Sequence, residues 1–435
     1  MYKYLSLLFL ICYLPVSAET LLELYYIAAQ YDPQLKIANS ERLIILQKKP
    51  QAQAPLLPQV TLNTNVGENW NDNAGQSIEN STIGYNISLS YALYRRDLKI
   101  QLKQTDGQIL QAEANYETAK QELIKRLADS YFAILTASDN VKFTIGAKKA
   151  FQQQLDDAKQ RFEVGLIAIT DVQEAQAGYD LAVADVIIAQ NKLDNAYETL
   201  RAITGTYHSV LATLKTNTPL MEPKIIDLDT WTEIALQQNP QILAIQQNLE
   251  VATQEIAKQR AADFPTIDLI SNYNYSDSIR GDENQAGNNV QGVSIGLQLN
   301  YSLYSGGITQ SRIKEAQHRR IQTLERLEQQ RRIVQMQTRQ AFLNLLSNIS
   351  KIKALKQALK STQTALQAIQ TGFELGTRTS VDVVNAQRDL LRAQSNHSTA
   401  RYDYVISTLQ LKQAVGMLSL EDLKIVNGWL VHEHL

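Results

Sequence analysis

Residues 372–387, GFELGTRTSVDVVNAQ, have a counterpart earlier in the chain at residues 161–176, RFEVGLIAITDVQEAQ. The two stretches align without a gap at an offset of 211, so that Gly165 matches Gly376 and Asp171 matches Asp382. Glycine supplies the left-handed backbone conformation that ends a helix, and a following Thr or Asp can cap the next helix. The pattern predicts a helical hairpin turn that the chain uses twice.

The duplication extends along most of the chain, and such a repeat decides how the whole fold is read. Residues 32–34 (DPQ) match residues 239–241 (NPQ) at an offset of 207. Residues 89–94 (LSYALY) match residues 299–304 (LNYSLY) at an offset of 210. We therefore expect two structural repeats, at residues 19–205 and 229–416. A linker at 206–228 would join them, and a C-terminal segment at 417–435 would follow the second repeat.

The first 18 residues have the pattern of a secretory signal peptide, with Lys3, an apolar run and the small residues of a cleavage site at Ala18. The only cysteine, Cys12, lies within this segment, so we expect no disulfide or cysteine-bound metal in the mature chain. No later segment approaches 18 continuous apolar residues, which argues against a transmembrane helix. The net charge of −2 argues against a nucleic-acid partner.

Apolar and polar residues alternate with a period of two in four segments. In residues 59–70, for example, Val60 and Leu62 alternate with Thr61 and Asn63. Each segment has about the nine to eleven residues of a tilted membrane strand, although a water-exposed antiparallel sheet would alternate in the same way. The four predicted strands are about 59–70, 84–94, 266–277 and 291–304.

Two observations favour the membrane interpretation. The polar faces are small and nearly uncharged, as a water-filled lumen requires, and the loops expected at 71–81 and 278–289 are long and polar. Four strands cannot close a barrel, and open sheet edges are not tolerated in lipid. If these strands span a membrane, the chain must therefore oligomerise, and three copies would supply about twelve strands.

After each strand pair, the hydrophobic period becomes helical. Residues 97–164 and 308–375 contain no proline, and about 68 residues of helix make a rod of roughly 100 Å. Beyond the repeated turns, helices expected at 170–204 and 381–415 run back. A helix of this length cannot bury its apolar stripe in a compact core, so it needs neighbours along its whole length.

Four stretches, two of which include the repeated turns, resemble the TolC family of outer-membrane channel proteins, and the resemblance covers essentially the whole mature chain. They are QRFEVGLIAITDVQEAQAGYD, NKLDNAYETLRAITG, FELGTRTSVDV and ARYDYVISTLQLKQAVG. The resemblance implies a mostly α fold with a transmembrane β part. In it, a homotrimer shares one β-barrel, with four strands from each chain, which continues as a long α-helical barrel. Residues 206–228 and 417–435 would form a mixed α/β equatorial belt.

The resemblance also implies a function and partners. The protein would lie in the outer membrane and extend into the periplasm, as the exit duct of a tripartite efflux pump or type I secretion system. It would conduct drugs, small molecules or proteins. Its partners would be outer-membrane lipid, a periplasmic adaptor (membrane fusion protein) and an inner-membrane transporter of the RND, ABC or MFS type, with no nucleic acid.

Other function classes fit the sequence less well. A passive porin would spend its length on strands, and a periplasmic adaptor would lack a duplicated pair of lipid-facing strands. The motif GVSIG at residues 292–296 spells G-x-S-x-G, but it lies in an alternating strand with no helix after it, so it is not a nucleophile elbow. We therefore expect no enzyme activity, no metal and no cofactor.

The family resemblance gives the repeated turn a role as a periplasmic aperture that is closed at rest. Arg378 matches a gate residue that pairs with Asp171 and Thr170, while Gln154 and Asp171 match the partners of an aromatic hydroxyl. Here Phe373 stands where the type member has Tyr. A lost hydrogen bond is worth about 0.5–1.5 kcal/mol, so three copies would lose about 1.5–4.5 kcal/mol per trimer.

The same resemblance indicates an electrostatic ring and a docking surface. The family's two acidic rings match Asp382 and Asn385, of which only Asp382 is acidic, so we expect weaker block by multivalent cations. The turns themselves match the family's contact with the adaptor. The residues concerned are Val164, Gly165, Leu166, Leu375, Gly376 and Thr377.

Overall fold

The computed structural model describes residues 18–73, 76–208, 210–220, 227–280 and 289–431. The predicted signal peptide therefore lies outside the described residues, apart from Ala18. The chain forms two compact units. The strand unit contains residues Ala38–Glu117 and Pro240–Arg332, and the helical unit contains Met1–Ile37, Thr118–Asn239 and Ile333–Leu435. Among the described residues, none of the helices combines the length and the apolar character that crossing a membrane requires.

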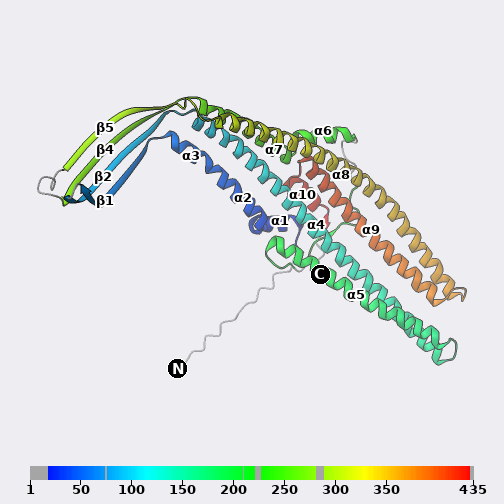
Figure 1. Cartoon of the computed structure of the whole chain (residues 1–435). Coiled ribbons are helices and arrows are strands. Elements are labelled where there is room, and N and C mark those ends of the chain that lie inside the picture. The colour runs from blue at the N-terminus through cyan, green and yellow to red at the C-terminus, as the bar shows by residue number, and fades with distance from the viewer. Residues whose placement is uncertain (1–17, 74–75, 209, 221–226, 281–288, 432–435) are drawn as a thin grey trace, which may run out of the picture. The chain divides into compact units, whose positions relative to one another are not determined.

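One antiparallel sheet with the order β1-β2-β4-β5 dominates the strand unit (Figure 1). Its strands are β1 (Gln59–Asn73), β2 (Gln76–Tyr94), β4 (Thr266–Arg280) and β5 (Asn289–Asn300). Each repeat contributes one hairpin, and the pairing of β2 with β4 joins the two hairpins. The edge strands are therefore β1 from the first repeat and β5 from the second.

The register separates the side chains of this sheet onto two faces. Leu62 lies opposite Ile87 on an apolar face, whereas Asn86 lies opposite Asn274 on a polar face. The two asparagine side chains are hydrogen-bonded, with 2.5 Å between Nδ2 of Asn86 and Oδ1 of Asn274. On the apolar face, Val60 and Leu62 are 67% and 64% exposed, so the described residues leave this part of the face uncovered.

The first predicted loop, at residues 71–81, is wrong. β1 continues to Asn73 and β2 begins at Gln76, and these two residues face each other in the register. Backbone hydrogen bonds hold an antiparallel pair together whatever the side chains are, so the strands continue after the apolar alternation has stopped.

The second hairpin also differs from the prediction. β4 reaches Arg280 rather than ending near 277, and the remainder of the expected loop, residues 281–288, lies outside the described residues. β5 ends at Asn300 instead of continuing to 304. The register explains this early end, because β4 begins at Thr266, which is already opposite Asn300. The alternation of residues 301–304 therefore continues without a partner strand.

Two helices pass without interruption through both units. They are α4 (Arg96–Glu163) and α8 (Ile308–Glu374), and their returning partners are α5 (Ile169–Thr204) and α9 (Ser380–Val415). The core of the helical unit contains fully buried side chains of α4 and α9, among them Tyr131 and Tyr404. Tyr131 donates a hydrogen bond of 2.6 Å to the carbonyl of Ala212.

Shorter elements complete the fold (Figure 1). The first repeat opens with α1 (Leu21–Tyr31), α2 (Pro33–Leu46), α3 (Lys48–Gln53) and η1 (Ala54–Leu56). The second opens with α6 (Leu228–Gln238), α7 (Pro240–Arg260) and η2 (Ala261–Asp263). The linker and the C-terminal segment meet in a small sheet of β3 (Thr213–Leu214) and β6 (Leu430–Val431), which follows α10 (Leu420–Asn427).

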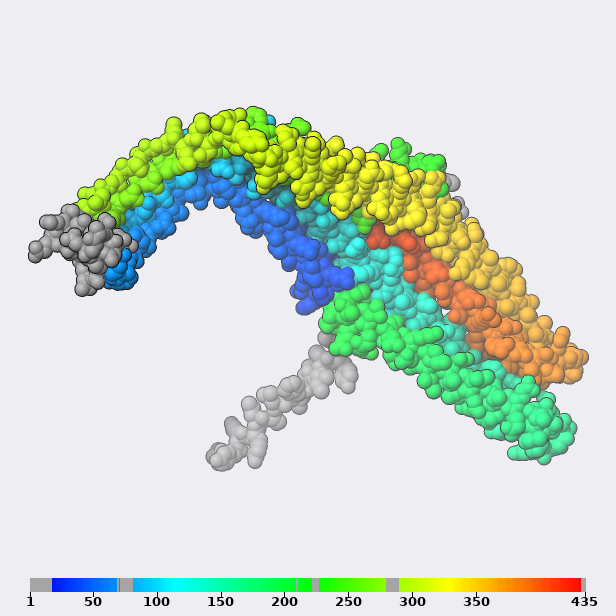
Figure 2. Space-filling view, in the orientation of Figure 1, coloured from blue at the N-terminus to red at the C-terminus, as the bar shows by residue number. Residues whose placement is uncertain are grey.

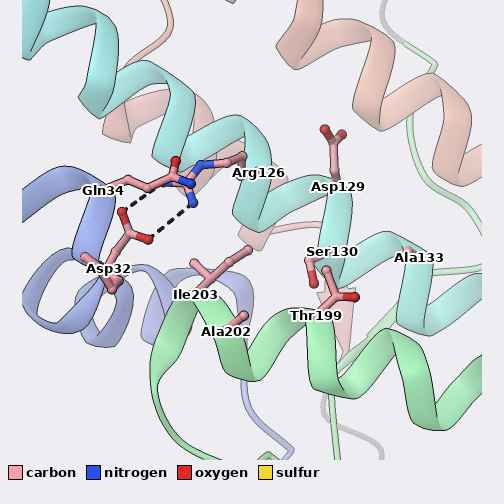
Figure 3. Close-up of a pocket in the computed structure, with 10 residues that line it drawn as sticks. Asp32, Gln34, Arg126, Asp129, Ser130, Ala133, Thr199, Ala202 and Ile203 are labelled. Carbon is pink, nitrogen blue, oxygen red and sulfur yellow. Dashed lines mark hydrogen bonds and ion pairs between the residues drawn. The ribbon is translucent and has the colours of Figure 1, made fainter.

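An ion pair between the buried Asp32 and the partly exposed Arg126 fixes the break between α1 and α2 (Figure 3). The Asp32 side chain is 1% exposed; its carboxylate accepts the backbone N–H of Leu35 at 2.8 Å and two hydrogen bonds from Arg126 of α4, at 3.2 and 2.8 Å. The pair borders a cavity of about 560 Å³ between the α1–α2 junction, α4 and α5. In the second repeat, Asn239 caps the matching break and donates instead to the carbonyl of Ala414.

Candidate functional site

The two repeated turns lie at the tips of the hairpins α4–α5 and α8–α9 (Figures 1 and 2). At the first tip, the Leu166 N–H donates to the carbonyl of Arg161 at 2.8 Å, and the Gly165 N–H donates to that of Phe162 at 2.9 Å. Gly165 has a φ of 75°, so the two bonds form a Schellman motif, which satisfies the last carbonyls of α4.

The second tip repeats this geometry. The Thr377 N–H donates to the carbonyl of Gly372 at 2.8 Å, and the Gly376 N–H donates to that of Phe373 at 3.0 Å. Gly376 has a φ of 77°, which a residue with a Cβ rarely adopts. The duplicated sequence therefore produces the same backbone turn twice.

The two tips differ in how they cap the returning helix. At the start of α9, the Thr379 hydroxyl accepts the Asp382 N–H at 3.2 Å, and the Asp382 carboxylate accepts the Thr379 N–H at 2.9 Å, which completes a capping box. At the start of α5, the cap residue is Ala168, and the Asp171 carboxylate accepts its N–H at 3.2 Å. Asp171 is therefore not the N-cap residue of α5; it occupies the third helical position and contributes to the cap from inside the helix.

Capping also sets the charge of the predicted electrostatic ring. The backbone N–H of Thr379, its hydroxyl and then the positive charge of Arg378 lower the pKa of Asp382 below its usual range. Hydrogen bonds to the ionised carboxylate stabilise the charged form, so Asp382 keeps its negative charge at lower pH than an ordinary aspartate. Asn385 is exposed in the following turn of α9 and carries no charge.

The first tip has a small apolar core of its own. Leu155 of α4 packs with Val172 and Ala175 of α5, and all three are buried. Ile167, the residue that follows the turn, packs against this cluster. Gln154, beside Leu155 in sequence, is half-buried, and Thr170 is exposed in the first turn of α5. The first hairpin is therefore closed at its tip by apolar contacts.

Arg378 takes the position of Ile167 at the second tip, and its side chain packs over Gly372. A Cβ built on Gly372 would lie 2.8 Å from Cγ of Arg378 and 3.2 Å from Oγ1 of Thr377. Within the described part of a single chain, Arg378 forms no hydrogen bond or ion pair with Asp171 or Thr170. The structure thus places the predicted gate residues at the two tips without pairing Arg378 inside one chain.

Phe373 has a cationic neighbour that the sequence reasoning missed. The guanidinium carbon of Arg161 lies 5.8 Å from the centre of the Phe373 ring, within the range of a cation–π contact. Arg161 belongs to the last turn of α4, where a positive charge is favourable to the helix dipole. The sequence alone indicates only this preference for a positive charge at the helix end. It does not indicate the contact, because the contact joins residues from two different repeats.

Large apolar side chains are exposed on both turns. Val164, Leu166 and Leu375 are 69%, 74% and 76% exposed, although each belongs to an ordered turn rather than to a loose end. Figure 2 shows both tips uncovered at the end of the helical unit. Exposed apolar residues gathered at one place indicate an interaction surface.

The sequence profile of the outer membrane efflux protein family matches residues 24–206 and 231–417, which are the two repeats. The chain belongs to this family. It is 38% identical to outer membrane protein TolC of Vibrio cholerae, with 95% of this chain and 94% of that protein covered. It is 34% identical to outer membrane protein TolC of Escherichia coli, with 95% of this chain and 85% of that protein covered.

A solved structure confirms the fold of this efflux protein. The outer membrane channel CmeC of Campylobacter jejuni superposes with a TM-score of 0.79 at 15% identity, and the match covers 94% of this chain and 90% of CmeC. The predictions of a TolC-family member, a mostly helical fold with a β part and a location in the outer membrane are confirmed. The family consists of efflux channels rather than enzymes, so the protein is an outer-membrane efflux or secretion channel.

Proposed function

We propose that three copies of the chain form one closed duct that crosses the outer membrane and the adjoining periplasm. The observation that carries this proposal is the open four-stranded sheet, whose edge strands β1 and β5 have no partner on their outer sides among the described residues. Their apolar side chains are exposed, for example Val66 by 78% and Ile295 by 74%. Lipid would cover these side chains, and the strands of neighbouring copies would pair the edges.

The duct serves a transport complex with two further components. The exposed residues of the turns, Val164, Gly165, Leu166, Leu375, Gly376 and Thr377, receive the tip of a periplasmic adaptor. The adaptor connects the duct to an inner-membrane transporter of the RND, ABC or MFS type, which selects the drugs, small molecules or proteins to be exported. The apolar side chains among these residues, exposed by 69–76%, support this assignment.

The tips close the periplasmic end of the duct at rest. Arg378 has no partner in Asp171 or Thr170 of its own chain, so we assign its partners to Asp171 and Thr170 of a neighbouring copy. Phe373 has no hydroxyl to donate to Gln154 or Asp171, so this closure lacks one hydrogen bond per chain. An Arg–carboxylate pair is strong when it is bidentate and shielded from water, but modest when exposed.

Charge at the entrance then sets how cations interact with the closed pore. Three copies of Asp382 form one acidic ring, and Asn385 leaves the next position neutral. The ring attracts cations with half the charge of a two-ring relative, so block by multivalent cations is weaker.

Two measurements test the proposed function. Native mass spectrometry of the outer-membrane fraction should find a trimer; a monomeric porin or a periplasmic protein would refute the duct. In planar bilayers, the Arg378→Ser variant should raise single-channel conductance above that of the wild type. Unchanged conductance would refute the assigned gate. The gain should also exceed that of the same substitution in a relative that retains Tyr at the aromatic position.

A further inference from the structure

The contact between Arg161 and Phe373 joins the first helical hairpin to the second at their tips. Arg161 lies in the last turn of α4 in the first repeat, and Phe373 lies in the last turn of α8 in the second repeat. We propose that Arg161 is a further gating residue, which holds Phe373 by a cation–π contact and keeps the two tips of one chain together. This inference rests on the proposed function, because it adds a residue to the same closure.

The place of the contact makes it sensitive to movement of the hairpins. The two hairpins also meet at Asp139 of α4, which accepts a hydrogen bond of 2.8 Å from the Tyr402 hydroxyl of α9. Along α4, Asp139 lies about 33 Å before Arg161, since each helical residue rises about 1.5 Å. If one hairpin tilts about the contact between Asp139 and Tyr402, its tip is displaced most, so the contact between Arg161 and Phe373 breaks early.

The backbone on both sides of the contact is fixed. The Arg161 carbonyl accepts the Leu166 N–H at 2.8 Å, and the Phe373 carbonyl accepts the Gly376 N–H at 3.0 Å. These bonds hold the helix ends in place within each hairpin. The distance between the guanidinium and the ring therefore depends on the position of one hairpin relative to the other, which is the coordinate that opening changes.

Phenylalanine suits this role chemically. The face of an aromatic ring carries partial negative charge, and a planar guanidinium can stack on it. The ring needs no hydroxyl for this contact, so Phe373 can contribute to closure although it cannot donate a hydrogen bond. The nearby Lys159 is also exposed in α4 and provides a matched cation that contacts no aromatic ring among the described residues.

A double-mutant cycle on the open-to-closed ratio in planar bilayers tests the inference. The variants are Arg161→Gln, Phe373→Leu and the double variant, with Lys159→Gln as the control for loss of charge. Loss of one exposed cation–π contact should raise the open-to-closed ratio of one chain about two- to fivefold. If three chains open together, each single variant should raise the ratio by about tenfold to a hundredfold.

The double variant should show little more opening than either single variant, because both remove the same contact. Independent, multiplicative effects of the two substitutions would overturn the inference, as would an equal effect of Lys159→Gln. The Arg378→Ser variant separates this inference from the proposed function. If Arg378→Ser opens the pore but Arg161→Gln does not, the gate stands and the role of Arg161 is refuted.

Discussion

Replacing Gly372 with alanine should open the resting pore while making α8 locally more stable. Gly372 lies in the last turn of α8, where alanine is favoured over glycine by about 0.8–1.0 kcal/mol. The added Cβ would lie 2.8 Å from Cγ of Arg378, well below the optimal carbon–carbon separation of about 3.5–4.0 Å. Because Cγ is near the root of the side chain, Arg378 must change its rotamer and leave its present position.

The assay compares single-channel conductance and thermal unfolding of Gly372→Ala, Arg378→Ser and the wild type. Gly146→Ala is the matched control, since Gly146 is also helical and a Cβ there would lie 3.4 Å from Cδ2 of Leu391, an ordinary contact. We expect Gly372→Ala to reproduce most of the conductance gain of Arg378→Ser, with a melting temperature at or above that of the wild type. Wild-type conductance in a correctly assembled Gly372→Ala trimer would refute the reasoning, because Arg378 would then reach its partner without the space that Gly372 leaves.

Three further predictions concern the ring, the docking surface and the fold. Asn385→Asp should strengthen block by multivalent cations, and Asp382→Asn should weaken it. Because the pKa of Asp382 is lowered, block of the wild-type channel should persist as the pH falls through about 3.9 and be lost only below that value. A cation titration at several pH values checks both expectations. Leu166→Asp should abolish efflux in cells without changing conductance of the isolated channel, and retained efflux would exclude this residue from the adaptor contact. Arg126→Met should lower the free energy of unfolding by about 2–3 kcal/mol, which is less than for a fully buried pair because Arg126 is partly exposed. Asp32→Asn should lower the free energy of unfolding by a smaller amount. Equal denaturation midpoints for the wild type and both variants would show that the ion pair contributes nothing to stability.

The long helices and turns could be predicted because their signals are local. Glycines followed by capping residues mark helix ends, and the structure ends α4 at Glu163 and α8 at Glu374, each within one residue of the expected end. The cap of α5 could not be predicted in the same way. The helix begins one residue earlier than expected and uses Ala168, so that Asp171 caps from inside the helix.

The ends of the strands could not be predicted from alternation. Alternation reports where one face of a strand meets an apolar environment, but pairing depends on whether a partner backbone lies alongside. β1 and β2 therefore continue past the alternating segment to Asn73 and Gln76, while β5 stops at Asn300, where its partner β4 begins. The contact of Arg161 with Phe373 was missed for a related reason, since the two repeats meet only in three dimensions.

Both repeats form the same turn, but the cationic residue precedes the turn in the first repeat and follows it in the second. The first repeat has Arg161 before the turn and Ile167 after it, where Ile167 packs into the apolar cluster. The second repeat has Gly372 before the turn and Arg378 after it, and the missing side chain of Gly372 makes room for Arg378. The first tip is thus anchored by apolar packing, and its Arg161 lies over the Phe373 ring of the second tip. The second tip carries Arg378, which the proposed gate pairs with a neighbouring copy. Exchanging the residues at only one of these two positions would place both cations on one hairpin and none on the other, so the proposed closure within and between chains requires both differences.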